Sequence, residues 1–75
     1  MLNRSLQAQH LSNLVDYLIA GARHIERQKG LIKELERDGH DTAQAQQTLK
    51  QMEELHKIYL SEKNRLLKEV AQDEG

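Results

Sequence analysis

Apolar residues recur along this chain with the spacing of packed helices. In the first half, positions separated by alternating steps of three and four residues are mostly apolar: Leu11, Leu14, Leu18, Gly21, Ile25, Gln28, Ile32 and Leu35. In the second half, a stripe with the same spacing consists of Ala45, Leu49, Met52, His56, Tyr59, Lys63, Leu66 and Val70. Such heptads place an apolar stripe along one side of an α-helix, where it packs against another helix. The pattern predicts an all-α fold of two long helices.

The segment LERDGHDTAQAQ, residues 35–46, separates the two stripes and predicts a turn. Gly39 suits the left-handed conformation that often ends a helix. Asp41 suits the N-cap of the next helix, and Gln44, three residues later, completes a capping box. The segment lacks the alternating oxygen ligands and the closing glutamate of a calcium-binding loop. We expect one domain, residues 1–75, with helices at about 3–37 and 42–72 and a turn at about 38–41.

Reversal of the chain at this turn produces an antiparallel, coiled-coil-like hairpin. Facing residues then have numbers that add to about 79 or 80, which places Gly21 opposite Tyr59 and alternates small with large side chains. Away from the turn, the hairpin carries more apolar side chains than one seam can cover. We expect these to form an interaction surface: Leu11, Leu14, Val15, Leu18, Ile19, Ile58, Leu60 and Leu67. Two hairpins stacked through this surface would form a four-helix bundle, so the sequence predicts a homodimer.

Composition narrows the classes of function. The 75 residues contain no cysteine, which excludes disulfides and thiolate zinc sites. Eleven basic and twelve acidic side chains give a net charge of −1, which argues against nucleic-acid binding through a positive field. The longest apolar-rich run, residues 14–22, is interrupted by Asp16 and is too short to span a bilayer. Because the N-terminal pattern is not that of a signal peptide, we expect a cytoplasmic protein.

One short motif suggests metal chemistry. Glu53 and His56 have the Glu-x-x-His spacing that di-iron bundles use, and His24 is expected to face His56. A di-metal site also needs an inward glutamate from each remaining helix, whereas the first helix offers Gln28 at this level. The favoured interpretation is a buried polar layer of Gln28 and the two histidines, which would specify the register. A metal-binding or metal-sensing bundle is the alternative, and no cofactor is expected.

Catalysis is not predicted by any set of residues in this sequence. It contains no glycine-rich phosphate loop, and its serines have no base at a useful spacing. We expect a small non-enzymatic protein-interaction or regulatory hairpin that packs with itself or with a partner protein. A peripheral membrane-surface protein is a further alternative, although residues 1–22 lack the lysine-rich polar side that such helices carry.

From Arg23 onward, spaced residues form a recognisable frame: Arg23, Ile25, Gln28, Ile32, Leu35, Gly39, Asp41, Ala45, Leu49 and Met52. This frame resembles that of short bacterial proteins, many of them alphaproteobacterial, whose activity is uncharacterised. The resemblance covers residues 23–70 and leaves out residues 1–22. It implies a bacterial origin and a helical hairpin, and it assigns no catalytic or binding residue.

Overall fold

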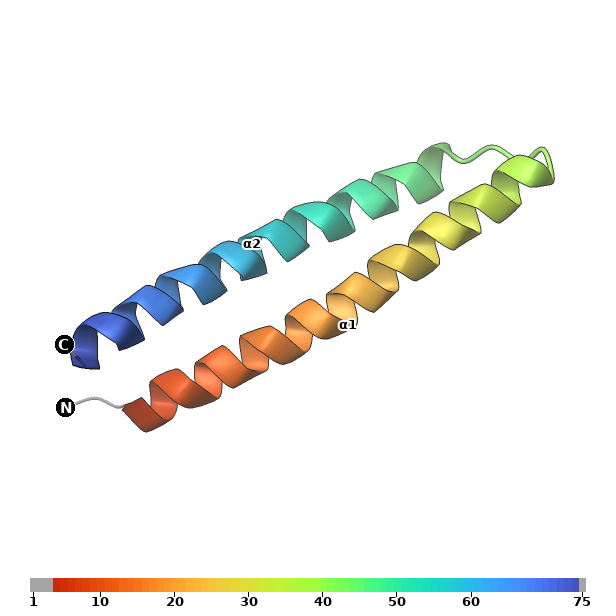
Figure 1. The fold of residues 1–75 in the computed structure, drawn as a ribbon. Helices are drawn as coiled ribbons and strands as arrows, with labels where there is room; N and C mark the ends of the chain where they lie inside the picture. Colours follow the sequence, from red (N-terminus) through yellow and green to blue (C-terminus); the bar gives the residue numbers. More distant parts are fainter. Residues whose placement is uncertain (1–3, 75) are drawn as a thin grey trace.

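The chain forms a pair of long helices joined by a short turn (Figure 1). The computed structural model describes residues 4–74, with the side chains of residues 5–72. Helix α1 comprises Arg4–Arg37 and helix α2 comprises Ala43–Glu74. Figure 1 shows the two helices side by side and antiparallel, so that the start of α1 and the end of α2 lie together at what we call the open end. The predicted all-α pair of packed helices is confirmed.

The end of α1 is closed by two backbone hydrogen bonds. The N–H of His40 donates to the carbonyl of Leu35 at 2.9 Å, and the N–H of Gly39 donates to the carbonyl of Glu36 at 3.1 Å. Together these bonds form a Schellman motif, which needs a residue in the left-handed conformation. Gly39 supplies it with a φ of 77°, a conformation that glycine adopts without steric cost.

The start of α2 differs in one detail from the predicted capping box. The carboxylate of Asp41 accepts a hydrogen bond from the N–H of Ala43 at 2.9 Å, and so caps the first turn. Gln44 is exposed, and among the described residues its side chain makes no hydrogen bond back to Asp41. The first backbone hydrogen bond of α2 runs from the N–H of Gln46 to the carbonyl of Thr42 at 2.8 Å. Thr42 therefore has the N-cap position, one residue later than predicted, and Gln44 is the second helical residue. A capping box closes from the third.

Four side chains form the core between the helices. Leu14, Ile25 and Ile32 of α1 and Leu66 of α2 are each at most 9% exposed. All four belong to the predicted heptad stripes, and every other position of the two stripes is half-buried. The apolar periodicity therefore identified the packed side of both helices.

The register of the seam differs from the prediction. A Cβ atom placed on Gly21 would lie 3.0 Å from Nδ1 of His56, and no atom of Tyr59 comes within 4 Å of that position. Tyr59 instead stacks on Tyr17, with the ring centroids 5.6 Å apart. The residue numbers of these two pairs add to 77 and 76, below the expected 79 or 80. The difference arises because side chains pack into holes between residues of the facing helix.

The hairpin is long and thin, so little of its surface is buried. Its principal axes measure 57 × 14 × 14 Å, and none of the described large side chains is fully buried. It exposes 5900 Å² to solvent. A compact monomer of the same 8.7 kDa mass exposes about 4,700 Å². A single hairpin therefore leaves far more surface in water than a typical protein of its size.

Candidate interaction surface

Three of the eight residues expected on the interaction surface lie in the seam between the helices. Leu14 is 3% exposed, and Leu11 and Leu18 are half-buried, because all three are heptad positions that pack against α2. They are not free to bind a partner while the hairpin is closed. The other five are exposed: Val15, Ile19, Ile58, Leu60 and Leu67.

These five exposed residues lie on two different sides of the hairpin. Successive residues of an α-helix are rotated by about 100°, so Ile58 and Leu60 point nearly opposite ways. Val15 and Ile19 each follow a seam residue by one position, as do Leu60 and Leu67. In an antiparallel pair, the side chains that directly follow a seam position point to the same side of the hairpin on both helices. Ile58, which precedes a seam residue, is on the other side.

The side that follows the seam has no charge from the open end to the layer of Gly21 and His56, where the exposed Lys57 follows His56. We call this part of it the uncharged face, and it consists of nine exposed residues: Ala8, Ser12, Val15, Ile19, Ala22, Leu60, Asn64, Leu67 and Ala71. It combines small residues with larger apolar ones, so that another helix can pack closely against it. This face contains four of the residues predicted for the interaction surface.

The opposite side, which we call the tyrosine face, is made by residues that precede seam positions. It includes both apolar and charged residues: Leu6, Tyr17, His24, Leu55, Ile58, Glu62, Arg65 and Glu69. Tyr17 is 55% exposed and Leu55 is 49% exposed, although neither was predicted to be part of the surface. Their positions directly before Leu18 and His56 are the sequence signal that could have identified them.

Arg65 is the centre of an ion-pair network on the tyrosine face. Its guanidinium forms two hydrogen bonds to Glu62, the one from Nε at 3.2 Å, and also pairs with Glu69. The hydrogen bonds from Arg65 hold the pKa of Glu62 below its ordinary value, and the positive charges of Arg65 and His10 act in the same direction. Glu62 in turn raises the pKa of Arg65. The network keeps this side of α2 charged near the open end.

A hollow of about 100 Å³ opens between the helices on the tyrosine face. It is lined by Tyr17, Gly21, His24, Met52, Leu55, His56 and Tyr59. Nδ1 of His56 is buried there without a hydrogen-bond partner. Gln28 is not part of the hollow, because its Nε2 donates to the backbone carbonyl of Ala45 at 2.9 Å. Gln28 and the two histidines, which were expected to form one buried polar layer, therefore lie in two separate places.

The three metal-ligand candidates do not converge. Glu53 follows a seam residue and His24 precedes one, so they lie on opposite sides of the hairpin with His56 between them. Among the side chains of residues 5–72, no three His, Asp or Glu are placed to hold a metal ion. The Glu-x-x-His spacing therefore brings two residues to neighbouring turns of α2 without a third ligand.

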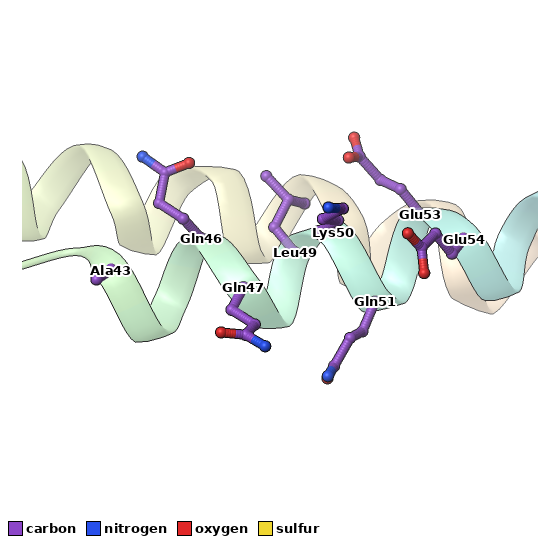
Figure 2. A pocket seen from close by; sticks show the side chains of 8 residues that line it. All are labelled: Ala43, Gln46, Gln47, Leu49, Lys50, Gln51, Glu53 and Glu54. Carbon is purple, nitrogen blue, oxygen red and sulfur yellow. The ribbon is translucent and has the colours of Figure 1, made fainter.

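A wider, shallow hollow lies along α2 near the turn. It is lined by Ala43, Gln46, Gln47, Leu49, Lys50, Gln51, Glu53 and Glu54. Figure 2 shows that Gln46 and Glu53 point to one side of the helix, while Gln47 and Gln51 point to the other. Small-molecule sites are concave and have a few polar groups that converge on the ligand. The divergent side chains of this hollow do not make such a site.

Comparison of the chain with known protein families, curated proteins and solved structures finds no match in any of the three. The resemblance of residues 23–70 to short bacterial proteins therefore stays a prediction.

Proposed function

We propose that this chain is a small non-enzymatic interaction module, a helical hairpin that acts by packing against a second copy of itself. One observation carries the proposal: the uncharged face contains Val15, Ile19, Leu60 and Leu67, which are between 38 and 51% exposed. Contiguous apolar surface of this kind commonly marks a site of association. A regulatory or adaptor protein that binds a helix of another protein would use the same packing, which makes a partner protein the alternative occupant.

The small core of the hairpin supports self-association. Among the described residues, only Leu14, Ile25, Ile32 and Leu66 are buried. The chain has no cysteine, so disulfides cannot supplement this core. Small domains without such cross-links commonly gain the missing burial by oligomerisation. Stacking of two hairpins into a four-helix bundle would supply it.

The hollow beside Tyr17 and the hollow along α2 near the turn each favour a binding role over a catalytic one. Catalysis needs a nucleophile or an acid and a base arranged around a space that holds the substrate. The hollow beside Tyr17 has a volume of about 100 Å³, room for about three water molecules. The hollow along α2 is lined by side chains that point apart (Figure 2).

A cytoplasmic location is part of the proposal. Because the chain has no cysteine, its fold does not need an oxidising compartment. In the described part of the chain, neither helix combines the length and the apolar character needed to cross a membrane. Peripheral binding to lipid is a competing use of the uncharged face, because an amphipathic helix can bury such a side in a bilayer surface.

The solution mass tests the proposal. Light scattering across a range of protein concentrations should give a species of about 17 kDa, twice the 8.7 kDa of one chain. A folded chain that stays at 8.7 kDa at every concentration would overturn self-association. Co-sedimentation of that monomer with anionic vesicles would then favour the lipid surface.

A further inference from the structure

The two long sides of the hairpin differ in charge near the open end. On the uncharged face, all nine exposed residues lack an ionisable group. On the tyrosine face, α2 carries the Arg65 network with Glu62 and Glu69 at the same level. Covering that network would remove water from three charged groups, and such desolvation commonly costs more than the ion pairs return. A partner that covers the open-end half of the hairpin therefore has a smaller desolvation cost on the uncharged face than on the tyrosine face.

The exposed area of one hairpin matches what a stable dimer requires. Each hairpin exposes 5900 Å², which is about 1,200 Å² more than a compact monomer of its mass. Standard protein–protein interfaces bury about 800 Å² on each partner. A second copy on the uncharged face would therefore give each chain a degree of burial close to that of an ordinary small protein.

Charges nearer the turn decide how two copies lie against each other. Lys57 lies beside Ala22 at the inner edge of the uncharged face, and beyond it this side carries Glu26 and Lys29 on α1 and Lys50 and Glu53 on α2. In the observed register, Glu26 and Glu53 flank the layer of Ile25 and Met52. Lys29 and Lys50 flank the next layer, Gln28 and Leu49. If both turns were at the same end of a dimer, α1 of each copy would face α2 of the other and these like charges would meet. Like charges that face each other across an interface disfavour that arrangement.

We propose that a second copy of the chain covers the uncharged face, with the two open ends overlapping and the two turns at opposite ends of the dimer. In this arrangement α1 lies antiparallel to α1 of the other copy, and the two-fold axis passes near Val15, the middle of the face on α1. The overlapping parts form a short four-helix bundle with Lys57 at its inner edge, and the charged halves beyond Lys57 stay in water. This inference rests on the proposed function, because it requires the hairpin to self-associate.

The overlap gives the dimer a characteristic length. The middle of the uncharged face is about 15 Å from the open end, so two copies overlap over about 30 Å. With each hairpin 57 Å long, the dimer would be about 85 Å long. Two hairpins stacked with both turns at the same end would stay close to 57 Å.

A matched pair of charge substitutions tests which side is covered. Ile19 on the uncharged face is 51% exposed and Ile58 on the tyrosine face is 63% exposed, so neither side chain is needed to hold the seam. Ile19→Glu should weaken dimerisation by about 100-fold or more in sedimentation equilibrium, since the dimer would have to remove water from the new carboxylate. Ile58→Glu should leave the dimer intact, and circular dichroism should show the same helix content in both variants.

The outcomes of this pair separate the inference from the proposed function. If Ile58→Glu disperses the dimer and Ile19→Glu does not, the assigned face is wrong while self-association stands. Loss of the dimer in both variants also contradicts a one-sided interface. A wild-type chain that is monomeric throughout overturns the inference and the proposed self-association together.

Single cysteines test the arrangement of the two copies. Because the chain has no cysteine, one introduced thiol reports one contact. Val15→Cys, next to the proposed two-fold axis, should form a disulfide-linked dimer under mild oxidation. Ala20→Cys, exposed on the tyrosine face, should not. Small-angle scattering of the linked Val15→Cys dimer should give a maximum dimension of about 85 Å. A value near the 57 Å of one hairpin would overturn the reversed arrangement.

Discussion

Gly21 of α1 and His56 of α2 lie against each other across the seam. A Cβ atom on Gly21 would be only 3.0 Å from Nδ1 of His56, closer than carbon and nitrogen normally approach. Glycine in the middle of a helix costs about 1 kcal/mol relative to alanine. At this position the missing side chain has a packing role, because it makes room for the imidazole.

Two glycines of α1 should therefore respond differently to alanine. An added Cβ at Gly30 would meet no atom within 4 Å. Gly30→Ala should raise the free energy of unfolding by about 0.5–1 kcal/mol through helix propensity alone. Gly21→Ala should give no such gain, because the imidazole of His56 must move to accept the methyl group. Urea unfolding of both variants measures the difference.

The role of His56 can be separated from the propensity effect in a double-mutant cycle. In a His56→Ala background, Gly21→Ala should recover the gain that Gly30→Ala shows. If Gly21→Ala is equally stabilising with and without His56, the two residues are not in steric contact.

Gly39 should be sensitive to substitution for a conformational reason. Its φ is 77°, and an added Cβ would have no atom within 4 Å. Gly39→Ala should therefore lower the free energy of unfolding by about 1–2 kcal/mol, all of it from the left-handed backbone. Gly39→Asn should cost less, because asparagine tolerates this conformation better. Equal stability of all three proteins in urea would contradict the Schellman turn.

The heptad pattern was sufficient to predict which side of each helix packs. Leu14 and Leu66 are buried because they belong to the heptad stripes that form the seam. Every other position of these stripes is buried or half-buried. The turn was predictable for a local reason, since Gly39 and Asp41 act on backbone groups only a few residues away.

The axial register was not predictable to the same degree. A heptad specifies an angle around the helix but leaves the shift along the axis to the shapes of the side chains that meet. The pairing of Gly21 with His56 depends on how the imidazole fills the space beside the glycine. The predicted interaction surface combined Ile58 with Leu60 because they are close in the chain. The rotation of about 100° per residue separates them onto two sides.

The Arg65 network predicts the titration of a nearby carboxylate. Hydrogen bonds from Arg65 lower the pKa of Glu62, so carbon-13 NMR of Glu62 should show a pKa below the ordinary value of a glutamate. Arg65→Gln should raise it toward the ordinary value. Arg65→Lys, which keeps the charge but loses the paired hydrogen bonds, should have an intermediate effect.

The sign of the resulting pH dependence follows from linkage. Because the folded pKa of Glu62 is lowered, ionised Glu62 favours the fold above the ordinary carboxyl pKa, and this contribution is lost as pH falls through the folded value. The wild type should therefore lose more stability than Arg65→Gln on acidification. An unchanged Glu62 pKa in Arg65→Gln would contradict the network.

Leu66 and Leu67 are neighbours in the chain with different roles, and truncating each should separate folding from association. Leu66 is 5% exposed in the seam, whereas Leu67 is 46% exposed on the uncharged face. Leu66→Ala should lower the free energy of unfolding by about 2–4 kcal/mol at every protein concentration, because it opens a cavity in the core. Leu67→Ala should have little effect on a dilute, monomeric hairpin.

Protein concentration provides the readout for Leu67. The midpoint of urea unfolding of a self-associating chain rises with concentration, because only the folded state binds its copy. Leu67→Ala should reduce this rise, whereas Leu67→Met, which keeps the apolar volume, should preserve it. If Leu67→Ala destabilises the dilute hairpin as much as Leu66→Ala does, the two residues share the seam and the uncharged face is assigned wrongly.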